Sequence, residues 1–108
     1  MSIDLPKPIA SYFAADKVDR EAVARCFAPD GTVKDEGRIY VGTAAIAQWN
    51  AEASAKYQYT SEPFAAEQQG AMTVVTSRLT GNFPGSPVNL RYFFRLDENK
   101  IVSLEILP

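Results

Sequence analysis

The chain has 108 residues, 46% hydrophobic and 22% charged, and this composition predicts one globular domain rather than a disordered segment. Its formal net charge is −2, and its basic residues are scattered among acids, so nucleic-acid binding is not expected. It has no histidine and one cysteine, which argues against a zinc site, a histidine-activated nucleophile and an internal disulfide. We expect no metal and no cofactor, and acid–base chemistry must come from Asp, Glu, Tyr, Lys, Arg or water.

The first segment predicts a helix with one apolar face. Apolar residues recur at helical spacing: Leu5, Ile9, Tyr12 and Phe13. Pro6 and Pro8 confine the start of this helix to about residues 5–8, because proline is tolerated only in a first turn. The N-terminus lacks the features of a signal peptide, and no apolar run is long enough to span a membrane. We therefore expect a cytoplasmic protein without membrane contact.

A second helix is predicted to begin at Asp19, whose side chain is a good N-cap. Its buried side is formed by Val23, Cys26 and Phe27, and the turn Pro29-Asp30-Gly31 ends it. In this position Cys26 is expected to be a small core residue rather than a reactive thiol.

Two short strands and a third helix follow. The first strand covers about 32–35 and ends at Asp35, and Glu36-Gly37 turns the chain into the second, 38–41. The third helix is predicted from Gly42-Thr43, with Thr43 as its cap, to about residue 56. Its inner face is expected to carry three residues: Ile46, Trp49 and Ala53.

After residue 56 the pattern changes to period two, which predicts four strands at 57–69, 72–82, 88–96 and 100–107. Pro63 places the first of these at an edge or a bulge. Helices first and strands later predict an α+β fold, with three N-terminal helices on a curved antiparallel or mixed sheet in one domain, 1–108. Such a sheet would form a cone, open at one end, that can hold a ligand.

This order of elements and two stretches carry a family resemblance. The stretches are Ala28-Pro29-Asp30-Gly31-Thr32-Val33-Lys34-Asp35 and Gly42-Thr43-Ala44-Ala45-Ile46. The chain resembles the nuclear transport factor 2-like superfamily, and within it the SnoaL-like polyketide cyclases and the ketosteroid isomerases. The resemblance covers nearly the whole chain and specifies the fold better than the function.

The resemblance implies catalytic roles for three residues. Asp35 matches the family's base, and Tyr12 lies about where the family has a tyrosine oxyanion donor. Where the isomerases have an aspartate on a late strand, this chain has Tyr92, which departs from true steroid isomerases. From the residues alone, Asp35 is either a base at the mouth of a pocket or a solvated acid, and both tyrosines are either donors or core residues.

Four further residues are expected to bind the ligand. Trp49 and Tyr57 lie at and just beyond the inner stripe of the third helix, and Phe94 shares an apolar strand face with Tyr92. Arg78 either holds a ligand carboxylate or belongs to the outer surface of the sheet. The opposite face of the 88–96 strand interleaves charged and aromatic residues, Arg91, Phe93 and Arg95, which favours a subunit interface and a homodimer.

Three functions remain open at this point. The first is an isomerase or cyclase acting on a small apolar or aromatic carbonyl compound, with Asp35 as base and two tyrosines as donors. An epoxide hydrolase would need a second inward aspartate, which the sequence does not reveal, and a scytalone-type dehydratase would need histidine. The second function is a non-catalytic domain that binds an apolar ligand, and the third is an adaptor working through protein contacts.

Overall fold

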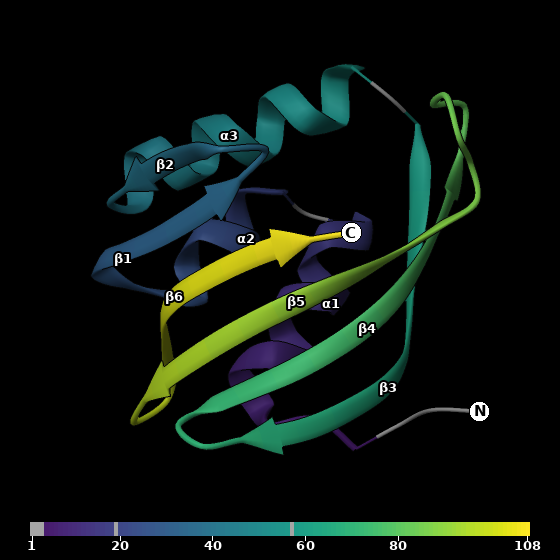
Figure 1. Cartoon of the computed structure of the whole chain (residues 1–108). Helices are drawn as coiled ribbons and strands as arrows, with labels where there is room; N and C mark the ends of the chain where they lie inside the picture. Colours follow the sequence, from purple (N-terminus) through teal and green to yellow (C-terminus); the bar gives the residue numbers. More distant parts are fainter. Residues whose placement is uncertain (1–3, 19, 57) are drawn as a thin grey trace.

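The computed structural model describes residues 4–18, 20–56 and 58–108, and in them three helices pack on one face of a curved six-stranded sheet (Figure 1). The helices are α1 (Lys7–Val18), α2 (Arg20–Arg25) and α3 (Thr43–Lys56). The strands are β1 (Phe27–Asp35), β2 (Arg38–Val41), β3 (Tyr59–Gln69), β4 (Met72–Gly81), β5 (Val88–Asp97) and β6 (Lys100–Leu107). We call the face of the sheet that carries the helices the concave face and the opposite one the convex face.

The strand order is β2-β1-β6-β5-β4-β3, so both edges of the sheet are built from central parts of the chain. β1 and β6 pair in parallel, and all other neighbours are antiparallel. The predicted α+β class with a mixed sheet is therefore confirmed. The description of all three helices as N-terminal holds only in part: α1 and α2 precede the first strand, whereas α3 follows the β1–β2 hairpin, at the position predicted for it.

Helix α1 begins where its prolines require. The carbonyl of Pro6 accepts hydrogen bonds from the amides of Ile9 and Ala10 at 3.0 and 2.9 Å, and Pro8 lies in the first turn, where its missing N–H costs nothing. Tyr12 and Phe13 are buried with Ile9, as the helical spacing predicted. This helix therefore turns two aromatic side chains toward the concave face.

Helix α2 is shorter than predicted. It ends at Arg25, and Phe27 belongs to β1 rather than to a helical stripe. The carbonyl of Arg25 accepts a hydrogen bond from Nζ of Lys100 at 2.8 Å, and the amide of Ile101 bonds the carbonyl of Cys26 at 2.9 Å. These contacts with the distant β6 end the helix at Arg25, four residues before Pro29.

Cys26 is half-buried, and the predicted N-cap of α2, Asp19, lies outside the described residues. Burial raises the pKa of the Cys26 thiol despite the nearby cations Lys100 and Arg25, which lower it. The thiol therefore stays protonated at neutral pH, as expected of a packing residue.

Strand β1 carries the predicted turn Pro29-Asp30-Gly31 inside it, as an irregular segment. Phe27 pairs with Ile101 of β6, whereas Thr32 pairs with Ser103, so β1 has three more residues than its partner between these pairs. The regular part of the strand, Thr32 to Asp35, matches the predicted range.

The turn of the β1–β2 hairpin and the start of α3 are set by residues next to them in the sequence. Asp35 pairs with Arg38, and the two residues between them have φ angles of 52° and 78° at Glu36 and Gly37. Positive φ at both central residues identifies a two-residue turn whose twist suits a hairpin. At α3 the amide of Ile46 bonds the carbonyl of Gly42 at 3.0 Å, so Gly42 takes the capping position predicted for Thr43.

The last four strands agree closely with the predicted ranges. β3 is an edge strand, and its register shifts between Pro63 and Ala65, so the proline marks both an edge and a bulge. On β5 the alternation is confirmed, since Tyr92 and Phe94 are 5% and 0% exposed whereas Arg91 is exposed. Within the described ranges, no helix is long and apolar enough to cross a membrane.

Candidate functional site

Asp35 lies at the end of β1, on the concave face beneath α3. Strand alternation puts it on the same face as the fully buried Val33, whereas Lys34 points to the convex face and approaches Glu105 at 3.6 Å. The hairpin turn fixes the backbone immediately after Asp35, so the carboxylate is held by a rigid element. The side chain is half-buried, which excludes the alternative of a fully solvated loop acid.

Trp49 of α3 holds the Asp35 carboxylate. Its indole Nε1 donates a hydrogen bond to Oδ2 of Asp35 at 3.0 Å, and its ring contacts that of Tyr40 at 6.3 Å between centroids. Trp49 is 6% exposed, so this bond is shielded from water. Trp49 was expected to bind ligand, and the structure shows instead that its polar atom is engaged with the acid.

The pKa of Asp35 is raised above its ordinary value of 3.8, mainly because burial disfavours the charged carboxylate. The hydrogen bond from Trp49 opposes this shift by stabilising the charge, the nearby Glu36 adds to it, and the Glu36 amide opposes it. A carboxylate that is partly desolvated but still bonded by one donor is a stronger base than a free aspartate.

Tyr12 projects from α1 into the layer between helices and sheet and is 3% exposed. Its ring makes edge contacts with Phe13, Phe27, Tyr92 and Phe94, at centroid distances of 5.1, 6.2, 6.3 and 5.5 Å. Burial raises its pKa well above 10, so the hydroxyl stays a proton donor throughout the physiological range.

Tyr92 lies opposite Tyr12 on β5 and belongs to a small polar network in the sheet. Ser61 of β3 hydrogen-bonds its hydroxyl, and the Ser61 and Ser77 hydroxyls lie 2.6 Å apart. Burial raises the pKa of Tyr92, and the bond from Ser61 only partly offsets the effect. Ser61 and Ser77 are 4% and 0% exposed, so these hydroxyls are shielded from bulk solvent. No sequence pattern predicted a role for these two serines.

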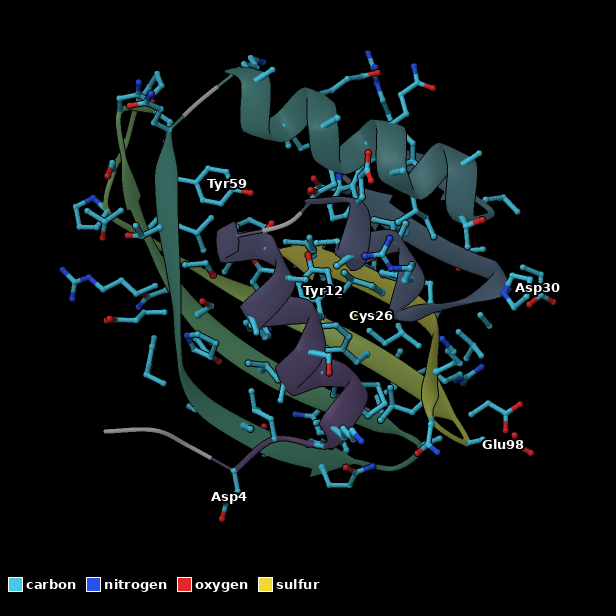
Figure 2. All side chains as sticks on the ribbon, turned by 180° about the vertical axis from the view of Figure 1, so that it is seen from behind. Asp4, Tyr12, Cys26, Asp30, Tyr59 and Glu98 are labelled. Atoms are coloured by element: carbon cyan, nitrogen blue, oxygen red, sulfur yellow. The ribbon has the colours of Figure 1, made fainter. Side chains whose placement is uncertain are left out.

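The carboxylates and the tyrosines share one electrostatic environment. The negative charge of Asp35 raises the pKa of both Tyr12 and Tyr92, and Asp16 of α1 does the same. Tyr59 of β3 is also coupled to both tyrosines, and Figure 2 shows its side chain projecting toward the helices, on the same side of the sheet as Tyr12. Asp35 and Tyr92 both pair with Ile106 of β6, so they lie two strands apart in the same row of the sheet, and the ring centroid of Tyr12 lies 6.3 Å from that of Tyr92.

Asp16 is the acid that sequence reasoning missed. Its Oδ1 accepts a hydrogen bond from Nδ2 of Asn50 at 3.1 Å, and Asn50 is 2% exposed. Asp16 lies four residues after Tyr12, and residues at this spacing share a helix face, so the sequence did contain a signal for it.

Two expected ligand-binding residues lie elsewhere. Arg78 is exposed on the convex face, because β4 turns the neighbouring Ser77 and Leu79 toward the helices instead. Phe94 is 0% exposed and packs on Tyr12 and Phe13, so it is a core residue with no surface open to a ligand. Arg78 thus lies on the outer surface of the sheet and Phe94 in the core, ligand binding by either stays a prediction, and Tyr57 lies outside the described residues. No three His, Cys, Asp or Glu side chains in the described part of the chain group as metal ligands.

The sequence and fold of this chain are similar to those of several known proteins. The family model of the SnoaL-like domain matches residues 9–104. A proposed polyketide cyclase of Sinorhizobium meliloti is 39% identical, with a TM-score of 0.92 over 99% of both chains. A protein of Catenulispora acidiphila with a ketosteroid isomerase-like fold, in complex with trimethylamine, is 21% identical, with a TM-score of 0.85 over 97% of this chain and 87% of its own.

A third structure, TerC co-crystallised with polyporic acid, is 18% identical and has a TM-score of 0.76 over 93% of this chain and 87% of that one. At 18 and 21% identity, the last two structures support the fold alone. No curated protein sequence gives a significant match. The family match over most of the chain, together with the curved mixed sheet and its three helices, shows that this protein belongs to the SnoaL-like family of the nuclear transport factor 2-like superfamily.

Proposed function

We propose that this protein binds a small apolar or aromatic carbonyl compound between its helices and the concave face of the sheet, and acts on it as an isomerase or cyclase. The ligand-bound neighbours support small-molecule binding, and the likeness to a proposed polyketide cyclase supports carbonyl chemistry. The observation that carries the proposal is the Asp35 carboxylate, half-buried and hydrogen-bonded by Trp49, with two buried tyrosine hydroxyls in electrostatic range.

The chemistry uses these groups in one step. Asp35 takes a proton from the carbon next to the carbonyl, and the electron pair of the broken C–H bond moves onto the carbonyl oxygen as an enolate. Tyr12 and Tyr92 donate hydrogen bonds to that oxygen. Protonation of the enolate at another carbon gives isomerisation, whereas attack of the enolate carbon on a second carbonyl gives cyclisation.

Deuterium exchange tests the proton-abstraction step without knowledge of the natural substrate. The probe is para-acetylbenzyl alcohol in heavy water, and proton NMR follows the loss of its acetyl methyl signal. The wild-type protein is expected to accelerate this exchange over buffer, and the acceleration should depend on Asp35. An exchange rate equal to that of buffer at millimolar probe would contradict the proposal.

The convex face favours a second candidate role, that of a dimeric scaffold or a non-catalytic binding domain. It carries a groove of about 370 Å³ over β3, β4 and β5. Eight residues line it: Ala65, Ala66, Glu67, Gln69, Val74, Thr76, Arg91 and Phe93. The guanidinium of Arg91 lies 5.6 Å from the ring centroid of Phe93 and donates to the carbonyl oxygen of Pro108 at 3.1 Å. An ordered arginine over an aromatic ring is typical of a subunit interface.

If two copies pair through this face, Arg91→Glu should weaken the dimer, because it removes the cation from Phe93 and places a second acid near Glu67. Sedimentation velocity should then show a shift toward monomer at micromolar concentration. The control is Arg38→Glu, the same charge change at an exposed position of β2. An Arg91→Glu protein that sediments like wild type would rule out this face as the interface.

A further inference from the structure

Two consecutive residues of α3 each hold one aspartate, and the two aspartates come from different elements. Nε1 of Trp49 donates to Oδ2 of Asp35 at 3.0 Å, and Nδ2 of Asn50 donates to Oδ1 of Asp16 at 3.1 Å. Both donors are nearly inaccessible, at 6% and 2% exposure. Burial of a polar amide costs free energy unless its hydrogen bonds are made, so Asn50 is placed here to hold a partner. Helix α3 therefore fixes two carboxylates at once.

Asp16 lies on the side of the site that carries the tyrosines. It follows Tyr12 by one helical turn on α1, so the two side chains share a face of that helix. The negative charges of Asp16 and Asp35 each raise the pKa of the Tyr12 and Tyr92 hydroxyls. The hydroxyls thus have a carboxylate from β1 and another from α1 within electrostatic range.

We propose that Asp16, held by Asn50, is a specificity-determining carboxylate of this site that contacts the substrate. It selects carbonyl compounds whose remote end carries a hydroxyl or ammonium donor, and it disfavours those that end in a carboxylate. The inference rests on the proposed function and deepens it, because it names the class of substrate that the site accepts.

The charges around the site support this selectivity. Among the described residues, Asp16 and Asp35 are the acids that raise the pKa of both Tyr12 and Tyr92. A carboxylate-bearing ligand beside these tyrosines would therefore lie next to two acids, which repel it. A hydroxyl or ammonium group would instead donate to Asp16, and hydrogen bonds to charged groups are stronger than neutral ones.

Three probes with one scaffold test the inference: para-acetylbenzylamine as its ammonium ion, para-acetylbenzyl alcohol and para-acetylbenzoate. Isothermal titration calorimetry gives their dissociation constants for the wild type and for Asp16→Asn. For the wild type we expect the ammonium ion to bind most tightly and the benzoate most weakly. In Asp16→Asn the ratio between these two should shrink by about tenfold or more. The variant is isosteric and keeps an acceptor for Asn50.

The matched control is Glu52→Gln, which removes one negative charge from an exposed position of α3, the helix that carries Asn50, and should leave the ratio unchanged. Deuterium exchange of the alcohol adds a second readout: Asp16→Asn should raise the half-saturating probe concentration and leave the maximal rate near that of the wild type. The inference is overturned if Asp16→Asn keeps the wild-type ratio, if Glu52→Gln changes the ratio equally, or if none of the probes binds the wild type.

The same data separate this inference from the proposed function. If Asp35→Asn leaves exchange intact while Asp16→Asn alters selectivity, the catalytic proposal fails and the role of Asp16 in recognition stands. If Asp35→Asn abolishes exchange while Asp16→Asn changes nothing, the catalytic proposal stands and the inference about Asp16 fails.

Discussion

Asp35→Asn is expected to lower the protein-catalysed rate of acetyl deuterium exchange by about 10²- to 10⁴-fold, which is the usual contribution of a positioned general base. The amide cannot accept the proton, yet it has nearly the same shape and can still accept the hydrogen bond from Trp49 that Asp35 receives at 3.0 Å. The loss should therefore appear in the maximal rate, with little change in probe affinity. Proton NMR in heavy water measures both.

The pH dependence of this rate follows from the raised pKa of Asp35. Because burial moves this pKa above 3.8, the base is lost at a higher pH than for a free aspartate, and the exchange rate should fall as pH decreases through that raised value. Asp35→Asn should lack this inflection. The control is Asp30→Asn, an exposed acid of the same strand, which should keep both the rate and the pH profile of the wild type.

The raised pKa also has a consequence for stability. The folded protein binds the Asp35 proton more tightly than the unfolded chain, so stability falls as pH rises from 3.8 through the folded pKa. Asp35→Asn removes this loss and should be more stable than the wild type at pH 7, with a smaller difference near pH 4. An Asp35→Asn protein that exchanges at the wild-type rate, or that is less stable than the wild type at pH 7, would contradict the role of a desolvated base.

Phe94→Ala should destabilise the protein by about 3–5 kcal/mol, the range observed when a buried phenylalanine is truncated. Phe94 is fully buried and its ring centroid lies 5.5, 5.9 and 6.1 Å from those of Tyr12, Phe13 and Tyr92. The substitution would open a cavity in the aromatic cluster that supports both proposed donors. Urea unfolding followed by circular dichroism measures the change in the free energy of unfolding.

The matched control is Phe64→Ala, since Phe64 is 50% exposed on the edge strand β3 and should cost far less. The comparison distinguishes a core residue from the ligand-binding residue that the sequence suggested. A Phe94→Ala protein that unfolds like wild type but binds the acetyl probes more weakly would show that Phe94 lines the ligand site after all.

Local sequence signals predicted most of the fold because hairpins and helix starts depend on neighbouring residues. Pro6 and Pro8 located the start of α1, and Glu36-Gly37 located the β1–β2 turn. The predictions were wrong where contacts between distant parts of the chain determine the structure. Helix α2 ends early because Lys100 and Ile101 bind the carbonyls of Arg25, its last residue, and of Cys26, the residue after it. No local pattern reveals that β6 pairs in parallel with β1.

The candidate site shows the same division. Asp35, Tyr12 and Tyr92 were identified by resemblance and by strand alternation, whereas the inward face of β4 could not be chosen, because both of its faces mix polar and apolar residues. Pairing with β5 determines which face of β4 is buried. Val75 pairs with Tyr92, which faces the helices, so Arg78, three residues later, lies on the convex face. The spacing of Asp16 from Tyr12 was a local signal for a shared helix face, but the bond from Asn50 joins two helices and could not be predicted locally.

Asp35 is a partly desolvated carboxylate whose charge is stabilised by the hydrogen bond from Trp49. Its titration can be followed by carboxyl-carbon NMR of the wild type and of Trp49→Phe between acid and neutral pH. We expect an Asp35 midpoint above 3.8 in the wild type and a higher midpoint in Trp49→Phe, because the lost hydrogen bond favoured the ionised form. A wild-type midpoint at or below 3.8, unchanged in Trp49→Phe, would contradict it.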